Sequence, residues 1–508
     1  MIKRGLFLLL TVWYTGIVAQ EARPVTISGR IHSDKDSVRL IIWFARDPIA
    51  GYGSEMKKIQ ATVDARRRFS FSTPPIAKPA RLSIHDAVSG TALFTREQQP
   101  IFPGDKVKLV ANIEADDFKA EFSGQGATKY ECIQELKKTG THTLDTARNI
   151  DHILYLYDSL VNARQKLVEK FKGRMTNEEY RLIKADMIGE LNKQALTTVC
   201  GYNPGSFHST KPSPDVMAQK KKAFEKLVAH LTTSNDTEII PQSVTYRQFL
   251  YQQSKAELVF ANNGEPVQMV QLFRKLSDQY TGLLREKLLG SLLLNTTENY
   301  YFFGGIDPDE HKACLKEAMS LIHSADLKTR IDHSLKGLVK GAPAFNFTLP
   351  VDSSRTKTTS LNDLKGKVVL LDLWSYQCTG CVLFTNTFHK KIYPEFKDNP
   401  DFAVVSVMLG ETGKDLYMRR LRREGGVTYT FPEYINLFGG RGIQSARDME
   451  SYHDISAFPT ILLVDKYGRV YSSTLPVIYG DPRNKELEKN RDKLIAWIKK
   501  ALSEPYPQ

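Results

Sequence analysis

A continuous apolar run near the C-terminus, Val368–Trp374, constrains the fold more than any other feature of the sequence. Six of its seven residues are apolar, and the seventh is Asp372. Such a run is typical of a strand that is buried on both faces, which requires helices on both sides of its sheet. Further apolar runs at Phe402–Met408 and Ile461–Val464 alternate with stretches of helical character. This order predicts an α/β layout for the last third of the chain.

Two cysteines, Cys378 and Cys381, follow this run where the predicted strand gives way to a helix. The free backbone N–H groups and the positive dipole end of a helix N-terminus favour a thiolate. We therefore expect Cys378 to be the nucleophile. Cys381, one turn into the helix, can attack a mixed disulfide formed at Cys378, which releases the reduced substrate and leaves an intramolecular disulfide.

Two structural interpretations of this cysteine pair are also open. A structural zinc site needs four ligands, whereas only the isolated His389 and His453 accompany the pair, so we expect no metal. A purely structural disulfide between residues three apart closes a very small loop and contributes little constraint to the unfolded chain. The spacing thus favours redox chemistry carried by the thiols themselves, without a cofactor.

The other three of the five cysteines, Cys132, Cys200 and Cys314, are far apart and have no metal-like spacing. We expect them to be buried and to pack as small apolar residues. Whether two of them pair with each other is left open by the sequence.

The first twenty residues have the layout of a secretory signal peptide. Lys3 and Arg4 precede an apolar stretch, Gly5–Val18, which is followed by Ala19 and then polar residues. The alternative, a retained membrane anchor, needs about 20 apolar residues, and this run is shorter. We expect export to the periplasm or cell envelope.

Between the leader and the α/β region, the hydrophobic period changes. Residues 21–124 alternate apolar and polar residues in short runs, which predicts a small all-β domain, either a sandwich or a barrel. Residues 125–338 carry apolar residues three and four apart, which predicts an α-helical domain. Gly341–Pro343 then introduces a third domain, 339–508. The helical segments expected in the middle region are Ile150–Phe171, Asn177–Leu196, Val216–Leu231, Gln248–Phe260, Val267–Leu294 and Asp307–Leu335.

The formal net charge of +13 raises the question of nucleic-acid binding. Basic residues are interspersed with acidic ones along the expected helices, as in Glu169–Lys172. The charge pattern therefore indicates solvated helix faces, and we expect no nucleic-acid partner.

Several motifs together resemble one family. They are Gly341–Phe345, Leu361–Lys367, the strand Val368–Trp374, the pair Cys378-Thr379-Gly380-Cys381, and Ile455–Thr460. In this combination, residues of about 339–508 resemble the thioredoxin-like TlpA/AhpC-TSA group of exported thiol-disulfide oxidoreductases. The resemblance implies a thioredoxin-like fold and exchange of disulfides with protein thiols. It also implies a thiol electron donor, for which a membrane-bound protein is one candidate.

The resemblance also implies roles for individual residues. Pro459 is expected to be a cis proline facing the cysteines, with Phe458 and Thr460 beside it binding an extended substrate segment. Asp372 matches a buried acid whose raised pKa would let it take the proton from Cys381, although a structural role is an alternative. Trp374 matches an aromatic wall of the site, and core packing is its alternative.

The residues around the pair depart from the family pattern, including Val382–Asn386, which lack the basic residue, the acid and the proline often found there. Gln377 stands where Trp is usual, and Thr379-Gly380 stands where Gly-Pro is common. Because such positions tune the thiolate, the expected role as reductant is not separated from oxidant or isomerase. Two other functions are also open: a thiol peroxidase, and an envelope binding or scaffold protein with an accessory thioredoxin-like domain.

Overall fold

The structure is a computed structural model of the chain. It describes residues 21–506 apart from positions 34–37, 47, 50–56, 87–91, 94–97, 113–119, 141, 202–212, 296–298, 300–301, 304–305, 338, 352–356, 411–413, 422–425, 441–442, 454, 456–457, 474 and 481–484. The expected signal peptide, residues 1–20, lies outside the described residues. One compact unit comprises residues 1–47 and 58–127, and the other comprises 48–57 and 128–508. The three-domain division expected from the sequence stays a prediction.

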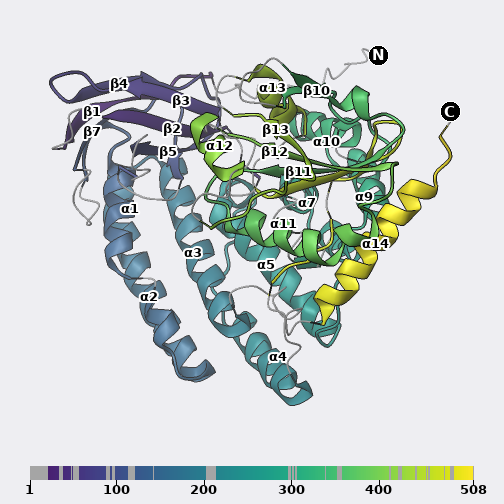
Figure 1. Ribbon diagram of the computed structural model, residues 1–508. Helices are drawn as coiled ribbons and strands as arrows, with labels where there is room; N and C mark the ends of the chain where they lie inside the picture. Colours follow the sequence, from purple (N-terminus) through teal and green to yellow (C-terminus); the bar gives the residue numbers. More distant parts are fainter. Residues whose placement is uncertain are drawn as a thin grey trace, which may run out of the picture. The chain divides into compact units, whose positions relative to one another are not determined.

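The first unit contains two four-stranded sheets (Figure 1). Burial alternates along their strands, for example in β4 and β7, because successive side chains point to opposite faces. Neither sheet closes on itself in the described part of the chain, so the barrel alternative is not confirmed. In the order of the first sheet, the strands are β4 (Arg68–Ser72), β1 (Thr26–His32), β7 (Lys106–Asn112) and β8 (Ala120–Gln125); in the second they are β3 (Lys57–Thr62), β2 (Arg39–Ala45), β5 (Ala80–Asp86) and β6 (Gln99–Ile101).

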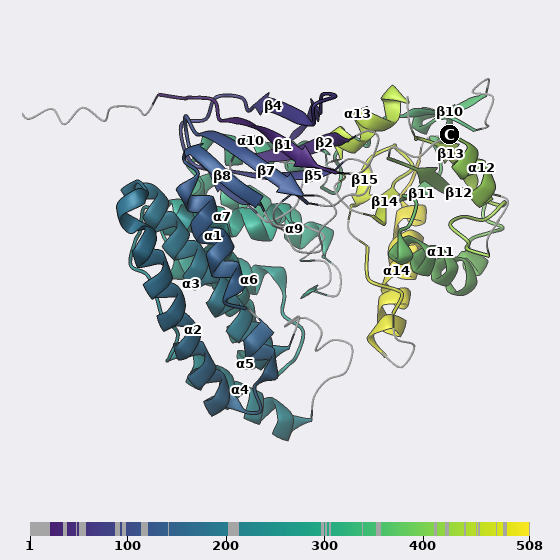
Figure 2. The ribbon, with the colours of Figure 1, turned by 90° about the vertical axis from the view of Figure 1, so that its left-hand side faces the viewer.

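The second unit begins with a helical region in which α2, α3 and α5 lie side by side (Figures 1 and 2). Every helix in the described ranges is too short or too polar to span a bilayer. The helices of this region are α1 (Thr128–Lys138), α2 (Ile150–Phe171), α3 (Asn177–Cys200), α4 (Pro214–Val228), α5 (Val244–Ala261), α6 (Met269–Gln279), α7 (Gly282–Leu294), α9 (Pro308–Leu321) and α10 (Ala325–Gly337).

Two segments expected to be continuous helices are broken in the structure. The stretch 267–294 divides into α6 and α7 because the backbone is extended at Tyr280 and Thr281, and Gly282 has a φ of 57°. The stretch 307–335 divides into α9 and α10, where Ile322 is extended. Apolar periodicity continues through both breaks, so it did not reveal them.

The three cysteines outside the Cys-x-x-Cys pair are buried, as expected. They are also free, which answers the question of pairing that the sequence left open. Burial raises the pKa of each of these thiols, at Cys132, Cys200 and Cys314, to about 12. They are therefore unreactive at neutral pH.

The helices α3 and α5 approach each other closely at Gly189. A Cβ atom at this position would lie 2.3 Å from the backbone nitrogen of Tyr246 and 2.4 Å from its Cα. Backbone atoms cannot move aside as a flexible side chain can. The approach of the two helices therefore depends on the absence of a side chain at residue 189.

We expect Gly189→Ala to push α3 and α5 apart and to lower the free energy of unfolding by about 1–3 kcal/mol. Gly173→Ala is the matched control because a Cβ there would meet nothing within 4 Å, and its effect should stay within about 0.5 kcal/mol. Urea denaturation followed by circular dichroism measures both. Equal stabilities of the two variants would contradict this account of the helix contact.

The C-terminal α/β region contains a five-stranded sheet in the order β13-β12-β11-β14-β15. β11 pairs in parallel with β12 and antiparallel with β14. The strands are β11 (Val368–Trp374), β12 (Phe402–Met408), β13 (Ile435–Phe438), β14 (Thr460–Val464) and β15 (Val470–Ser472); β9 (Thr348–Pro350) and β10 (Thr358–Ser360) form a separate hairpin. The helices are α11 (Thr379–Lys391), α12 (Lys414–Leu421), α13 (Gln444–Tyr452) and α14 (Glu486–Ser503).

All seven residues of β11 are buried, because helices cover both faces of the sheet (Figure 1). Val368 and Leu370 point to the side of α11 and α14, where they pack with residues such as Phe384 and Leu494. The alternate residues, such as Leu371, pack on the side of α13. By the same alternation, Asp372 points toward the α11 side.

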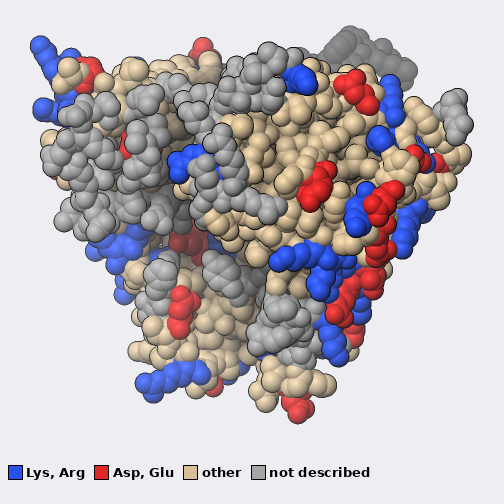
Figure 3. Space-filling view, viewed as in Figure 1, with Lys and Arg blue, Asp and Glu red and all other residues tan. Residues whose placement is uncertain are grey.

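The surface over α14 carries acidic and basic side chains together (Figure 3). Ion pairs three or four residues apart, such as Lys489 with Glu486, connect them. This mixture fits the expectation that the net positive charge is spread over solvated helix faces.

One histidine joins the end of α10 to the α/β region. The buried His453 Nδ1 donates to the carbonyl of Gly337 at 3.1 Å, and its Nε2 accepts from the N–H of Phe345 at 3.0 Å. Burial lowers the pKa of His453 to about 4, so the ring is neutral and can donate and accept at once.

Candidate active site

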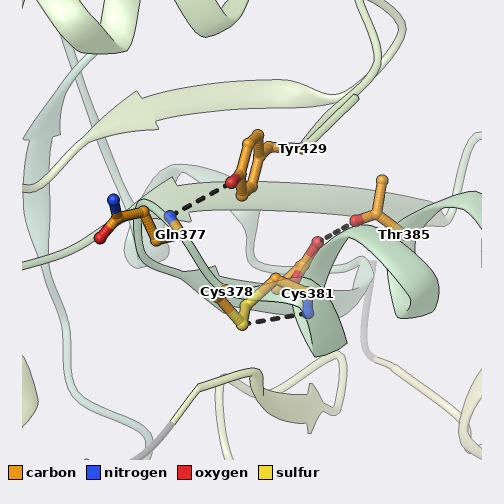
Figure 4. The surroundings of a disulfide bond; sticks show 6 residues. Gln377, Cys378, Cys381, Thr385 and Tyr429 are labelled. Atoms are coloured by element: carbon orange, nitrogen blue, oxygen red, sulfur yellow. Dashed lines mark hydrogen bonds between the residues drawn. A yellow bond between two sulfur atoms is a disulfide. The ribbon is translucent and has the colours of Figure 1, made fainter. Parts of the chain in front are cut away.

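The cysteine pair lies where β11 gives way to α11 (Figure 4). Cys378 is the N-cap residue of α11, and its Sγ accepts the N–H of Cys381 at 3.0 Å. A disulfide joins the two sulfurs, with the Cα atoms 5.3 Å apart. Cys378 is partly exposed and Cys381 is buried, so only the first sulfur is open to a partner. The helix N-terminus would stabilise a thiolate at Cys378.

The residue before the pair has an unusual backbone conformation. Gln377 has a φ of 66°, and its N–H donates to the hydroxyl of Tyr429 at 3.2 Å (Figure 4). The Tyr429 ring stacks on Trp374, with ring centroids 4.9 Å apart and an angle of 24° between the planes. A non-glycine residue in this region is strained and needs its surroundings to hold it. Tyr429 supplies that support, and sequence reasoning missed it.

Trp374, the predicted wall of the site, is almost fully buried in the cluster that contains Cys381. Its Nε1 donates to Ser406 Oγ at 2.9 Å. The ring therefore lies behind the disulfide as packed core, and it presents little surface to a substrate.

Pro459 lies against the cysteine pair. The Phe458–Pro459 bond is cis, and the proline Cδ lies 3.1 Å from where a Cβ of Gly380 would be. Thr460 is the first residue of β14 and pairs with Leu373 of β11. Pro459, the residue before it, therefore lies near the end of β11 that precedes the cysteines. The preceding residues of this motif at 456 and 457 lie outside the described residues.

Tyr479 is a further residue at this place that sequence reasoning missed. Its hydroxyl lies 3.3 Å from the same Cβ position of Gly380. Its ring meets Phe384 of α11 edge-on, with centroids 6.4 Å apart. The glycine noted as a departure from the family pattern thus leaves room for both Pro459 and Tyr479. A tyrosine in the loop after β15 carries no sequence signal that could have indicated this contact.

Asp372 lies beneath the pair, fully buried in the middle strand. Its Oδ2 accepts from Thr385 Oγ1 at 2.6 Å (Figure 4), whereas Oδ1 has no hydrogen-bond partner among the described residues. Burial raises the pKa of Asp372 to about 7, and the Thr385 hydrogen bond opposes this rise. Thr385 follows Cys381 by one helical turn and lies on the same face of α11. The carboxyl group therefore lies against the helix face that carries the second cysteine.

The part of the chain that holds the cysteine pair, the cis proline and the central sheet matches a known family. Residues 366–470 match a family model described as thioredoxin-like. The chain contains a thioredoxin-like domain. This confirms the fold predicted for the C-terminal region and supports the oxidoreductase class predicted from the sequence. The finer assignment to the TlpA group stays a prediction.

Comparison with curated proteins finds no match. Among solved structures, the chain is similar to the thioredoxin domain of a thiol-disulfide oxidoreductase from Bacteroides vulgatus, with 25% identity, 31% of this chain and 99% of that one covered, and a TM-score of 0.24. A protein described as thiol:disulfide interchange protein DsbE from Chlorobium tepidum shows 24% identity over 32% and 99% of the chains, with a TM-score of 0.24. A thioredoxin-like protein from Bacteroides caccae shows 15% identity over 61% and 93%, with a TM-score of 0.29.

The raised pKa of Asp372 predicts how stability depends on pH. The pKa rises from 3.8 to about 7 on folding, so the contribution of this group is fully present below about pH 4 and is lost as the pH rises through about 7. Since each pKa unit corresponds to about 1.4 kcal/mol, the loss approaches about 4 kcal/mol.

We therefore expect Asp372→Asn to become more stable relative to the wild type as the pH rises from about 4 to about 7, and to keep a constant advantage above that. The unpaired amide of the variant offsets about 1–3 kcal/mol of the gain. Urea titrations of the oxidised proteins, followed by tryptophan fluorescence, measure the difference. A difference that does not change with pH would contradict the burial of an ionisable carboxyl group here.

Proposed function

We propose that the protein is an exported thiol-disulfide oxidoreductase that exchanges disulfides with protein thiols. The observation that carries this proposal is the asymmetry of the pair: Cys378 is partly exposed at the N-terminus of α11, and Cys381 is buried behind it. The thioredoxin-like family match supports the same conclusion.

The reaction has two steps. The Cys378 thiolate attacks one sulfur of a substrate disulfide, and the other substrate sulfur leaves as a thiolate. Cys381 then loses its proton and attacks Cys378 Sγ, so that the bond between Cys378 and the substrate breaks and the second substrate sulfur leaves with the electron pair. The substrate gains two electrons, the protein pair loses two, and protons from the pair and water complete the substrate thiols.

Asp372 is the proposed acceptor of the Cys381 proton. A pKa of about 7 suits it to this role, because a group that titrates near the working pH can both take and release a proton. Pro459 and the neighbouring Phe458 and Thr460 are the proposed binding site for an extended substrate segment. Trp374 is proposed to support the pair from behind.

Whether the protein reduces or oxidises its substrate depends on the partner that restores the cysteine pair. We propose a reductant that is itself recharged by a thiol donor in the cell envelope, with Lys3, Arg4 and the apolar run after them directing export. Fractionation of cells that express the full chain tests the compartment. Reactivity of the pair toward a membrane-impermeant thiol reagent, after release of the periplasmic contents, tests whether the pair is reduced there.

Cysteine substitutions test the activity. We expect Cys378→Ser to abolish the acceleration that the protein gives to insulin reduction by dithiothreitol, because no thiolate remains at the helix N-terminus. Cys381→Ser should capture substrate at Cys378 and hold it, since the resolving thiol is missing. Mass spectrometry of the captured adducts measures this.

Cys314→Ala is the matched control, because this thiol is buried and lies outside the pair. It should retain wild-type reduction. Failure of Cys381→Ser to accumulate any mixed disulfide, alongside stable noncovalent partners, would favour the scaffold alternative. Peroxide consumption that persists in Cys381→Ser and vanishes in Cys378→Ser would favour a thiol peroxidase.

A further inference from the structure

The turn between β11 and α11 contains a backbone conformation that its residue does not favour. Gln377 has a φ of 66°, in the left-handed region that residues with a Cβ atom rarely adopt. Its side chain is exposed, so packing of that side chain contributes little to the turn. Its backbone N–H donates to the Tyr429 hydroxyl at 3.2 Å (Figure 4). The conformation of the turn therefore depends on a contact made by the backbone.

Tyr429 is held in place from two sides. Its ring stacks on the buried Trp374, and only 5% of the tyrosine is exposed. The carbonyl of Thr428, the residue before it, accepts from Asn386 Nδ2 of α11 at 3.3 Å. The short segment Thr428-Tyr429 thus binds both the turn that precedes Cys378 and the helix that follows it.

The position of the Cys378 sulfur depends on this turn. Cys378 is the N-cap residue of α11, and its Sγ accepts the N–H of Cys381 at 3.0 Å. The backbone angles of Gln377 set the direction in which the chain enters Cys378. They therefore decide whether the sulfur lies over the free N–H groups of the helix, where a thiolate is stabilised. A turn that relaxed to a more common conformation would move the sulfur away from these groups.

We propose that Tyr429 is a positioning residue for the nucleophile: its hydroxyl holds the turn at Gln377, and the turn holds the Cys378 sulfur on the N-terminal N–H groups of α11. This inference rests on the proposed oxidoreductase function. It deepens that function, because it assigns the reactivity of the first cysteine to a hydroxyl that lies 52 residues beyond Gln377 in the chain.

Alkylation by iodoacetamide tests the inference, because this reagent reacts with the thiolate and needs no disulfide substrate. The reduced full chain is treated between about pH 5 and about pH 10, and peptide mass spectrometry follows modification at Cys378. We expect Tyr429→Phe, which removes the hydroxyl and keeps the ring, to react about fivefold more slowly than the wild type at neutral pH. Its rate should reach half of its maximum at a higher pH, and the two rates should converge at about pH 10, where both thiols are ionised.

Substitutions at residue 377 test whether the turn connects Tyr429 to the sulfur. Because glycine adopts a φ of 66° without strain, Gln377→Gly in the Tyr429→Phe background should restore most of the lost rate. Gln377→Ala is the matched control for this rescue. It removes the same exposed side chain but keeps the Cβ atom that disfavours the left-handed region, so it should restore none of the rate.

Tyr417→Phe is the matched control for the loss of a hydroxyl. Tyr417 belongs to the same cluster as Trp374 and Tyr429, and its buried hydroxyl has no hydrogen-bond partner among the described residues. Its removal should leave both the rate and the pH profile of Cys378 unchanged.

Other ionisable groups lie around Cys378. They are Cys381 on α11, Asp372 on β11, Tyr417 on α12, and Tyr479 beside Gly380. Asp372 has a pKa of about 7 and titrates within the range of the experiment, whereas burial raises the pKa of Tyr417. Tyr429→Phe and the substitutions at residue 377 retain all four groups, so a difference between their profiles reports the turn.

Each contrary outcome decides against the inference. Identical profiles for Tyr429→Phe and the wild type overturn it, and so does a rate that is lowered equally at every pH, which would indicate obstructed access to Cys378. Failure of Gln377→Gly to restore the rate disconnects Tyr429 from the turn and has the same consequence.

The proposed function is tested separately from the inference. A wild type that alkylates rapidly at neutral pH but does not accelerate insulin reduction would contradict the oxidoreductase function and leave the placement of the sulfur intact. A wild type that accelerates insulin reduction, together with a Tyr429→Phe variant that alkylates at the wild-type rate, would leave the function intact and remove the role of Tyr429.

Discussion

The burial of β11 on both faces is the constraint on which the site depends. Side chains alternate along β11, so every second one packs on the α13 side of the sheet. The others, including Asp372, face α11. The strand end then starts α11 at Cys378, with one sulfur accessible and one enclosed. The same burial that holds the sheet together thus raises the pKa of the carboxyl group beside the helix. Fold stability and proton chemistry here come from one arrangement.

The sequence predicted the cysteine pair, β11, β12 and the proline, because each belongs to a short run or motif that can be read from neighbouring residues. It did not predict β13, since Ile435–Phe438 is only four residues long and lies in a stretch whose periodicity favoured helix. Tyr429 and Tyr479 reach the site from loops, where no periodic signal marks a position. Their contribution arises from tertiary contacts, which single-sequence patterns do not contain.

Contacts in the structure explain how two of the departures from the family pattern, Gly380 and Gln377, are accommodated. With Gly380 between the cysteines, the space that a side chain would take is bordered by the Pro459 ring and the Tyr479 hydroxyl. At Gln377, where an aromatic residue is usual, Tyr429 supports the strained backbone and covers Trp374 instead. The aromatic surface around the pair is therefore supplied from distant segments rather than from the motif itself.

The helical region contacts the α/β region through His453. This residue follows α13 and precedes the segment that leads to Pro459, and its ring bonds both Gly337 at the end of α10 and the backbone of Phe345. Only a neutral imidazole can donate to the carbonyl and accept from the N–H together. With a pKa near 4, the ring keeps this form over the range in which Asp372 titrates. The contact between α10 and the α/β region therefore keeps its form whatever the proton state of Asp372.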